Sequence, residues 1–166
     1  MNERPLIAKL AIEHDAANFD CGQEDLNDFI NRYALAGQWA NISRTYAAVQ
    51  GAEIAGYHTL VVGSVVYEGA PERLGKGIPR HPIPALLLAR LAVDKRRQGK
   101  GLGAALVVDA MRRTLQVADI AGVRAMLIHA KDATARDFYM HLGFEPFPGE
   151  PFVLHRLLKD IRAMLK

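Results

Sequence analysis

The chain of 166 residues is long enough to bury one hydrophobic core, and 50% of its residues are hydrophobic against 23% charged. Its net charge of +3 and sequence pI of about 9.1 are mildly basic, which does not by itself indicate a nucleic-acid-binding protein. No apolar run approaches the ~18 residues of a membrane span, and the first residues lack the pattern of a signal peptide. The single cysteine, Cys21, excludes an internal disulfide, so we expect a cytoplasmic protein without membrane contact.

The N-terminal half predicts a strand, an amphipathic helix and a hairpin. Residues 6–12 are mostly apolar and indicate the first strand. Four apolar residues then recur at helical spacing and predict the buried face of a helix: Leu26, Phe29, Ile30 and Tyr33. A hairpin is expected over 45–49 and 54–67, with its turn near Gln50-Gly51. Residues 68–84 are rich in proline and glycine and indicate an exposed loop.

The second half alternates strands with helices, which is typical of an α/β domain. A continuous apolar run over 85–93, broken only by Arg90, predicts a strand that is buried on both faces, and 102–118 predicts a mostly apolar helix. The next segments predict, in order, a strand, a helix and a last strand: 123–130, 133–142 and 152–157. Asp132 can cap the second of these and Gly143 can end it, and a short charged helix closes the chain.

The stretch that joins the strand over 85–93 to the helix over 102–118 is the most informative part of the chain. Glycines at 99, 101 and 103 let backbone N–H groups crowd around a ligand, and the helix that follows adds free amides and the positive end of its dipole. Four flanking side chains add positive charge: Lys95, Arg96, Arg97 and Lys100. The pattern predicts an anion site for a phosphate-rich cofactor, and a tight turn without a ligand is the alternative.

The glycine spacing separates the classes of phosphate-binding loop. A dinucleotide fold expects G-x-G-x-x-G with an acidic residue ~20 positions later, and a nucleoside-triphosphate loop expects G-x-x-x-x-G-K-[ST]; neither pattern is met. The pattern Q/R-x-x-G-x-G/A is met by Gln98, Gly101 and Gly103. On these residues the chain resembles the GNAT superfamily of N-acetyltransferases, in which this turn binds the pyrophosphate of an acyl-CoA.

The resemblance implies a fold, a co-substrate and a set of binding residues. The fold is the α/β GNAT fold over residues 1–166 as one domain, with a mixed central sheet, splayed central strands and flanking helices. The co-substrate is acetyl-CoA, and no metal is needed. Its pantetheine arm is expected on the backbone of Leu91, Ala92 and Val93. Its pyrophosphate is expected on the amides of the glycine turn: Gln98, Gly99, Lys100, Gly101, Leu102 and Gly103.

A second segment resembles the part of the family sequence that contains the proton donor. Residues 135–144 are similar to the A-x-x-F-Y-x-x-x-G-F segment of the family. Because the tyrosine hydroxyl there points at the thioester sulfur, the resemblance implies that Tyr139 is the general acid that protonates the CoA thiolate. The alternative is that Tyr139 only packs its ring against the sheet.

The sequence offers no evident general base, because residues 85–93 hold no glutamate. An α-amino group has a pKa of ~7.7–8.0, which esterification of the neighbouring carboxylate lowers further, whereas a lysine amine has a pKa of ~10.4. An aminoacyl ester is therefore partly neutral at cytoplasmic pH, and the missing base favours such a substrate. Four histidines are expected to be packed or surface residues rather than bases: His58, His81, His129 and His155.

The N-terminal third narrows the resemblance further. Residues 19–29 resemble the F-D-C-G-x-x-x-L-x-x-F/Y-L segment of GNAT toxins from bacterial type II toxin–antitoxin pairs, and residues 44–46 and 90–94 also resemble their counterparts there. This implies a toxin that acetylates the α-amine of charged tRNA and so blocks translation. It also implies a homodimer and a neutralising ribbon-helix-helix antitoxin, through which alone operator DNA is contacted.

A tRNA substrate needs cations around the acceptor site, because phosphate contacts dominate the affinity. Five arginines are candidates for these contacts: Arg32, Arg44, Arg90, Arg96 and Arg97. Arg90 stands out, because a charge within a buried strand needs a partner or a groove. Two other functions stay open, namely acetylation of a small amine or a peptide N-terminus, and a regulatory module that binds CoA or DNA without turnover.

Overall fold

The computed structural model describes residues 4–166, and its seven strands form a mixed sheet in the order β1-β2-β3-β4-β5-β7-β6. The strands are β1 (Leu6–Lys9), β2 (Arg44–Gln50), β3 (Glu53–Val65), β4 (Ile83–Val93), β5 (Ala125–His129), β6 (Glu145–Phe147) and β7 (Glu150–Leu157). The helices are α1 (Glu24–Asp28), α2 (Ala34–Trp39), α3 (Glu72–Gly75), α4 (Leu102–Ile120), α5 (Ala133–His141) and α6 (Leu158–Met164). Three further helical turns are the π-helical η1 (Phe29–Tyr33) and the 3₁₀ turns η2 (Tyr67–Gly69) and η3 (Lys95–Arg97). Between residues 4 and 166 no helix is long and apolar enough to cross a membrane.

The chain divides into two compact units. The first unit comprises the described residues up to Val61 together with Ala89–Ala110, and the second comprises Val62–Leu88 together with Met111–Lys166. The elements β3, β4 and α4 each contribute residues to both units. The expectation of a single domain over 1–166 stays a prediction.

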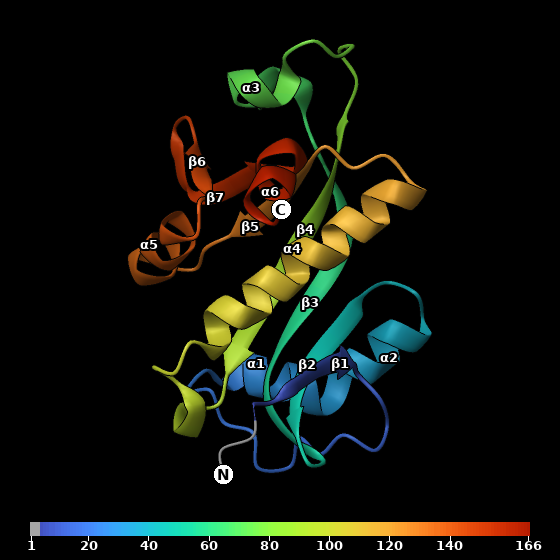
Figure 1. The fold of residues 1–166 in the computed structure, drawn as a ribbon, viewed down its shortest axis with the longest axis vertical. Helices are drawn as coiled ribbons and strands as arrows, with labels where there is room; N and C mark the ends of the chain where they lie inside the picture. The colour runs from blue at the N-terminus through green and yellow to red at the C-terminus, as the bar shows by residue number, and fades with distance from the viewer. Residues whose placement is uncertain (1–3) are drawn as a thin grey trace. The chain divides into compact units, whose positions relative to one another are not determined.

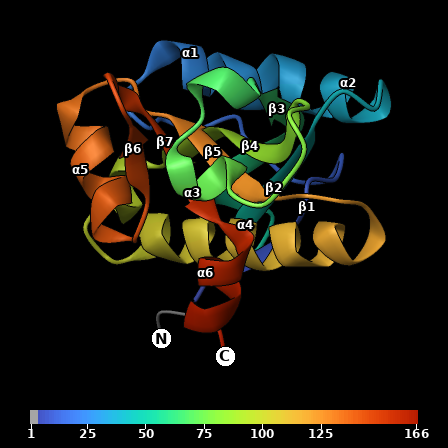
Figure 2. The same ribbon diagram turned by 90° about the horizontal axis from the view of Figure 1, so that it is seen from above.

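The first unit is built on the antiparallel strands β1, β2 and β3. Leu6 pairs with Val49 and Arg44 pairs with Leu60, and the hairpin predicted near Gln50-Gly51 is confirmed. Figure 2 shows α1 and α2 on one face of these strands and α4 on the other. The core on the α1–α2 face is formed by these buried residues: Leu10, Phe19, Phe29, Ile30, Ala34, Ala47, Ile54, Tyr57 and Ala92.

The predicted amphipathic helix is present, but its register changes at η1. Phe29 and Ile30 are buried as predicted, whereas Tyr33 is 59% exposed and Ala34 is buried in its place. A π-helical turn takes up one residue more than an α-helical turn, so the residue that follows Phe29 on the buried face is Ala34 rather than Tyr33. The prediction that Tyr33 faces the core is therefore wrong.

A glycine on β3 allows the close approach of β4 and α4 within the first unit. A Cβ at Gly56 would lie 2.9 Å from the Ala92 carbonyl oxygen and 3.0 Å from a methyl carbon of Leu106. We expect Gly56→Ala to lower the free energy of unfolding by about 1–3 kcal/mol, because a backbone oxygen cannot move aside as a side chain can. Denaturant unfolding checks this, with Gly63→Ala on the same strand as the control, since its Cβ would meet nothing closer than 3.9 Å. Equal stability of the two variants would contradict the close approach.

The second unit holds the parallel part of the sheet. Strand β4 pairs with β5 from Ala85–Ala125 to Leu88–Ile128, and β7 pairs antiparallel with both β5 and β6. Figure 1 shows these strands with α5 and α6 beside them. The parallel ladder ends at Leu88, although β4 continues to Val93. The core is formed by these buried residues: Val65, Leu74, Ile83, Ala85, Ala125, Leu127, Phe147 and Leu157.

Two details of the second unit differ from the sequence-based expectation. The loop expected over 68–84 contains the short helix α3, and Leu74 on that helix is completely buried in the core. The last strand begins at Glu150 and forms a hairpin with β6, which the sequence did not predict. The α4 and α5 helices, the Asp132 cap and the helix end at Gly143 are confirmed, with the Asp132 carboxylate accepting the Ala135 N–H at 2.8 Å.

Candidate active site

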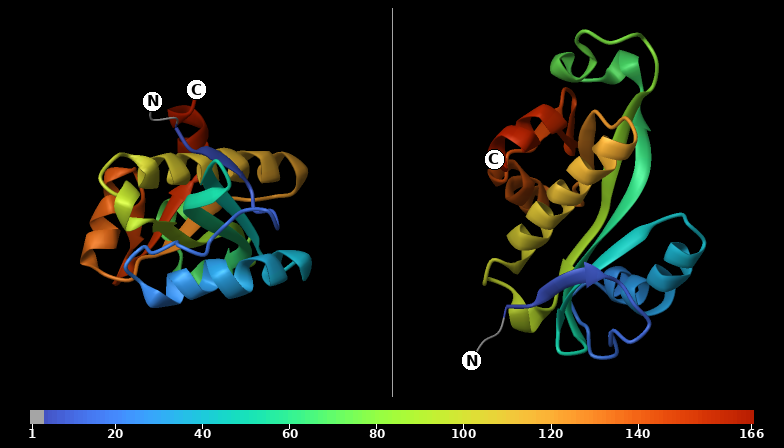
Figure 3. Two further views of the ribbon diagram at one scale, coloured as in Figure 1. Left: turned by 90° about the horizontal axis from the view of Figure 1, so that it is seen from below. Right: turned by 45° about the vertical axis from the view of Figure 1, so that its right-hand side comes forward.

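The glycine turn has the backbone geometry of an anion site. Gly99 and Gly101 have φ values of +76° and +84°, in the left-handed region that favours glycine, and Gly103 lies in the first turn of α4. A Cβ added at Gly99 or Gly101 would meet nothing within 4 Å, so the backbone of the turn is open to a ligand. The first N–H groups of α4 have no carbonyl partner within the helix and add further donors. Figure 3 shows this turn at the end of β4, in yellow-green.

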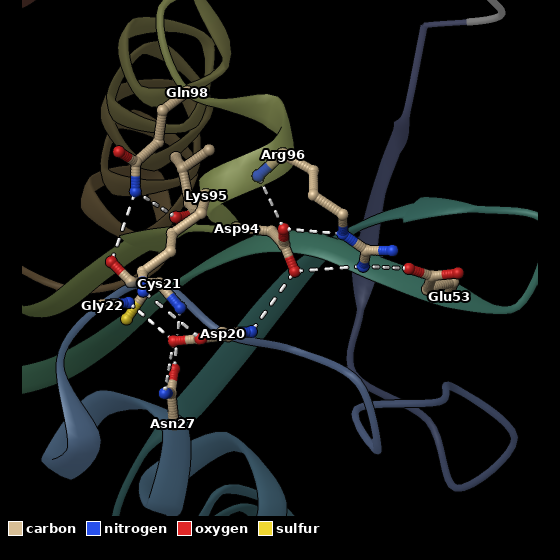
Figure 4. A network of polar contacts seen from close by, with 10 residues as sticks. Asp20, Cys21, Gly22, Asn27, Glu53, Asp94, Lys95, Arg96 and Gln98 are labelled. Carbon is tan, nitrogen blue, oxygen red and sulfur yellow. Dashed lines mark hydrogen bonds and ion pairs between the residues drawn. The ribbon is translucent and has the colours of Figure 1, made fainter.

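A network of hydrogen bonds fixes the turn to the segment Phe19–Gly22 (Figure 4). The Gln98 side chain donates to the Val93 carbonyl at 2.9 Å and to the Cys21 carbonyl at 3.3 Å. The Lys95 N–H donates to the Asp20 carbonyl at 2.8 Å. Because the Gln98 side chain is engaged with the protein, what Gln98 can offer a ligand is its backbone amide. Asp20 and Cys21 belong to residues 19–29, which resemble the GNAT toxins, and this segment is thus hydrogen-bonded to the glycine turn.

Asp94 is the centre of this network. Its carboxylate is almost fully buried and accepts the Arg96 N–H at 2.9 Å, the Arg96 Nε–H at 3.0 Å and the Asp20 N–H at 3.3 Å. Burial acts to raise the pKa of Asp94, but the hydrogen bonds from Arg96 outweigh it and hold that pKa below its usual value. Arg96 also pairs with Glu53, and both carboxylates raise the pKa of its guanidinium. The segment before the glycine turn is therefore held by charge-assisted hydrogen bonds.

The turn fits the diphosphate of an acyl-CoA on two observations. The open backbone at Gly99 and Gly101 gives a phosphate access to the amides. One guanidinium nitrogen of Arg97, Nη1, is buried and has no hydrogen-bond partner in the described chain, so it needs an acceptor such as a phosphate oxygen.

Within residues 4–166 no group of three or more His, Cys, Asp or Glu residues could hold a metal ion.

Tyr139 lies on α5 in the second unit and is held in place by aromatic packing. Its ring makes edge contacts with Phe138 and Phe144, at centroid distances of 5.2 and 6.1 Å. Its carbonyl accepts the Phe144 N–H at 3.1 Å across the left-handed turn at Gly143. Its hydroxyl has no hydrogen-bond partner among the described residues, and burial raises the pKa of Tyr139 to about 12. The hydroxyl therefore keeps its proton at neutral pH and is available as a donor.

The raised tyrosine pKa values predict a loss of stability in alkaline solution. Burial raises the pKa of Tyr57, whose hydroxyl donates to the Leu26 carbonyl at 2.7 Å, as it does that of Tyr139. In the unfolded chain both tyrosines ionise near pH 10, so above that pH unfolding releases protons. Stability is thus full below about pH 10 and falls as the pH rises toward the folded-state values. Melting temperatures measured across this range check it, and a flat profile above pH 10 would contradict the burial of these hydroxyls.

The five arginines predicted to contact tRNA all lie in the first unit, and the structure gives them different surroundings. Arg44 donates to the Gln38 carbonyl at 2.8 Å at the end of α2, and Arg96 belongs to the Asp94 network. Arg90 stacks on the Phe29 ring, with its guanidinium carbon 3.8 Å from the ring centroid, which answers the need of a buried-strand cation for a partner. Arg32 is exposed on η1 and has no charged partner among the described residues. Contact of any of the five with tRNA stays a prediction.

Sequence reasoning missed the pair formed by the fully buried His58 and the partly buried Asp109. The two side chains meet at 2.8 Å between Nε2 and Oδ2, and the His58 ring stacks on Tyr46. Asp109 is the only charged residue in the apolar first half of α4, which was the available signal. His58 is packed, as expected, and so is His155, whose pKa burial lowers. Cys21 packs against the core of the first unit, and burial raises the pKa of its thiol.

Comparison with known protein families decides the class. The family described as "Acetyltransferase (GNAT) domain" matches residues 41–146. The chain belongs to the GNAT acetyltransferase family. The resemblance found on Gln98, Gly101 and Gly103 is thereby confirmed, and the mixed sheet is that of a GNAT enzyme.

Individual relatives place this GNAT chain near a group of toxins. It is 40% identical to the "tRNA-acetylating toxin" of Mycobacterium tuberculosis over 151 residues, which cover 91% of this chain and 90% of the relative. It is similar to the structure of AtaT complexed with acetyl-methionyl-tRNAfMet, with a TM-score of 0.89, 30% identity and coverage of 97% and 99% of the two chains. It is also similar to an AtaT mutant bound to the C-terminus of the antitoxin AtaR and acetyl-CoA, with a TM-score of 0.82, 27% identity and coverage of 97% and 98%. The predicted resemblance to GNAT toxins is confirmed.

Proposed function

We propose that this GNAT chain is a toxin that transfers the acetyl group of acetyl-CoA to the α-amine of aminoacyl-tRNA, and so removes the nucleophile of peptide-bond formation. The observation that carries the proposal is the match over nine-tenths of the chain to a tRNA-acetylating toxin. The open amide turn at Gly99 and Gly101 and the unpartnered Tyr139 hydroxyl supply the two functional parts that this reaction needs.

The chain's residues have separate roles in the reaction. Acetyl-CoA, when bound, supplies the activated acetyl group. The amides from Gln98 to Gly103 hold its pyrophosphate, and the backbone of Leu91, Ala92 and Val93 binds the pantetheine arm. As the amine forms the amide bond and the carbon–sulfur bond breaks, the Tyr139 hydroxyl donates its proton to the departing thiolate. The attacking amine loses one proton to solvent, and the tyrosine regains one from solvent.

The acceptor must arrive largely as a neutral amine. Strand β4, from Ile83 to Val93, contains no carboxylate that could act as a base. The ester-linked α-amine of an aminoacyl-tRNA meets this condition near neutral pH, and a lysine side chain does not. We expect Arg32 and Arg90 to contribute cations for the acceptor end of the tRNA. What supports this is that Arg32 is exposed without a charged partner among the described residues and that Arg90 stacks on the Phe29 ring rather than pairing with a carboxylate.

The proposal extends to partners and location. The toxin acts as a homodimer in the cytoplasm, and residues 1–166 form one acetyltransferase domain. A ribbon-helix-helix antitoxin neutralises it, and operator DNA is contacted only through that antitoxin. The likeness to a toxin that binds the C-terminus of an antitoxin supports the pairing with an antitoxin. Co-expression with the product of an adjacent small gene tests the pairing, since the toxin should then become tolerable to the cell.

Transfer of labelled acetyl from acetyl-CoA to a mixed pool of charged tRNA tests the activity. We expect label on charged tRNA, none on uncharged tRNA, and none on charged tRNA whose α-amine has been blocked beforehand. Label on a panel of small amines or on peptide N-termini, with charged tRNA left unlabelled, would overturn the proposal in favour of another acetyltransferase. Binding of CoA with no acceptor labelled would overturn it in favour of a module without turnover.

A further inference from the structure

Helix α5 ends in a Schellman motif that includes Tyr139. The Phe144 N–H donates to the Tyr139 carbonyl at 3.1 Å, and the Gly143 N–H donates to the Met140 carbonyl at 3.0 Å. Gly143 has a φ of +96°, the left-handed conformation that this motif requires. The ring contact between Tyr139 and Phe144 is the apolar contact that commonly accompanies the motif. The turn after α5 thus fixes both the backbone and the ring of the proposed acid.

A side chain from β7 is bonded to this helix end. Leu142 caps α5, and its carbonyl accepts the Nη1–H of Arg156 at 2.5 Å. Among the described residues the guanidinium makes no other hydrogen bond, and its Nε is buried without a partner. A cation is favourable at this end of a helix, because the helix dipole is negative there. Since Arg156 pairs with Met126 of β5, its side chain joins the end of α5 to the sheet, and Figure 1 shows β7 beside α5.

Gly143 and Arg156 fit closely together. A Cβ at Gly143 would lie 2.4 and 2.5 Å from two atoms of the Arg156 guanidinium. A side chain at position 143 would therefore displace the guanidinium from the Leu142 carbonyl, besides straining the left-handed backbone. Glycine at this position thus provides the conformation of the turn and the space for the guanidinium.

We propose that Arg156 is a positioning residue, which holds the end of α5 so that the Tyr139 hydroxyl stays where it donates its proton. This inference rests on the proposed acetyl transfer and on the proton donation assigned to Tyr139. Because that hydroxyl has no hydrogen-bond partner among the described residues, its position depends on the backbone and the ring packing of Tyr139. A shift of the helix end moves both, and a misplacement of about 1 Å is enough to lower a rate by about 100-fold.

Steady-state kinetics with charged tRNA test the proposal. Arg156→Gln should lower kcat by about 10- to 100-fold and leave the KM for acetyl-CoA within about twofold of the wild type. Arg156→Lys keeps a cation and a donor and should recover most of this loss. Gly143→Ala displaces the guanidinium without altering it and should lower kcat as well. In a Tyr139→Phe background, Arg156→Gln should change kcat by less than about twofold, because the hydroxyl that it positions is absent.

Arg124→Gln is the matched control. Arg124 also lies in the second unit, and its guanidinium also donates to carbonyls, those of Leu74 and Lys76 at 3.1 and 2.9 Å. This control should lower the melting temperature about as much as Arg156→Gln and leave kcat unchanged. An equal loss of kcat in the two variants, or a full effect of Arg156→Gln in the Tyr139→Phe background, would overturn the proposal and leave Arg156 a purely structural residue.

Amide hydrogen exchange gives a second readout that needs no substrate. The Leu142 and Phe144 N–H groups both donate to the Tyr139 carbonyl and should exchange at least about tenfold faster in Arg156→Gln than in the wild type. Arg124→Gln should leave their exchange unchanged, and unchanged exchange in Arg156→Gln would overturn the proposal. A wild type that labels no charged tRNA would contradict the proposed function, whereas faster exchange in Arg156→Gln would still support the hold of Arg156 on Tyr139.

Discussion

Replacing Tyr139 by phenylalanine is expected to lower kcat for acetyl transfer by about 100- to 10,000-fold, the usual contribution of a positioned general acid. The substitution removes only the hydroxyl, and the contacts of the ring with Phe138 and Phe144 remain. Because that hydroxyl has no hydrogen-bond partner in the described structure, its loss should leave the melting temperature nearly unchanged. Steady-state kinetics with charged tRNA, together with thermal unfolding, measure both effects.

A matched control for this change is Tyr67→Phe in the same unit. The guanidinium carbon of Arg80 lies over the Tyr67 ring, 5.9 Å from the ring centroid. Tyr67 has no proposed part in the reaction. Its kcat should equal that of the wild type. If Tyr139→Phe retained a kcat within a few-fold of the wild type, another group would have to protonate the thiolate, and the acid role of Tyr139 would be wrong.

The second large effect is expected at Asp94. Asp94→Ala removes a buried carboxylate that accepts three hydrogen bonds from Arg96 and one from the Asp20 N–H. It leaves the Arg96 guanidinium with Glu53 alone and removes the acceptor of the Asp20 N–H, so that the Lys95–Asp20 backbone hydrogen bond is left to join η3 to that segment. We expect the free energy of unfolding to fall by about 1–3 kcal/mol, since the backbone N–H groups of Arg96 and Asp20 lose their acceptor. The KM for acetyl-CoA should rise by about tenfold or more, because a misplacement of about 1 Å in a positioning element is enough for such a loss.

Asp160→Ala is the control for this prediction. It breaks the ion pair of Asp160 with Arg73, whose side chains are 37% and 55% exposed, and should cost no more than about 1 kcal/mol. Asp94→Asn keeps an acceptor oxygen and should fall between the alanine variant and the wild type. Urea unfolding and calorimetric binding of CoA give the two readouts. If Asp94→Ala were no less stable than Asp160→Ala, the network would not hold the turn.

Most of the fold could be predicted from the periodicity of apolar residues and from residues that begin or end helices. The errors have identifiable causes. Helix α4 and strand β4 have long, clear apolar patterns, and both occur where predicted. The exposure of Tyr33 could not be predicted, because a single π-helical turn shifts the register without a mark in the composition. Helix α3 could not be predicted, because prolines and glycines surround its buried leucine, Leu74. Strand β6 could not be predicted, because it has only three residues, one of which is Pro146.

At the candidate site, features set by neighbouring residues could be predicted from the sequence, and contacts between distant residues could not. The left-handed glycines and the cap of α5 are local features, and the sequence indicates them directly. The contacts of Asp94 with Asp20 and of Gln98 with Cys21 could not be predicted, because these partners lie more than seventy positions away along the chain. Arg96 illustrates the consequence. Its neighbours in sequence indicate an anion site, whereas its contacts with Asp94 and Glu53 give it a structural role.

The most direct test of the central claim identifies the atom that receives the acetyl group. Charged tRNA is incubated with the protein and acetyl-CoA, then digested with a nuclease that releases the terminal aminoacyl-adenosine, and the product is analysed by mass spectrometry. We expect aminoacyl-adenosine with one added acetyl group on its α-amine, and none after reaction with Tyr139→Phe. Unmodified aminoacyl-adenosine, in a reaction where the wild type has consumed acetyl-CoA on another amine, would contradict acetylation of the tRNA-linked α-amine.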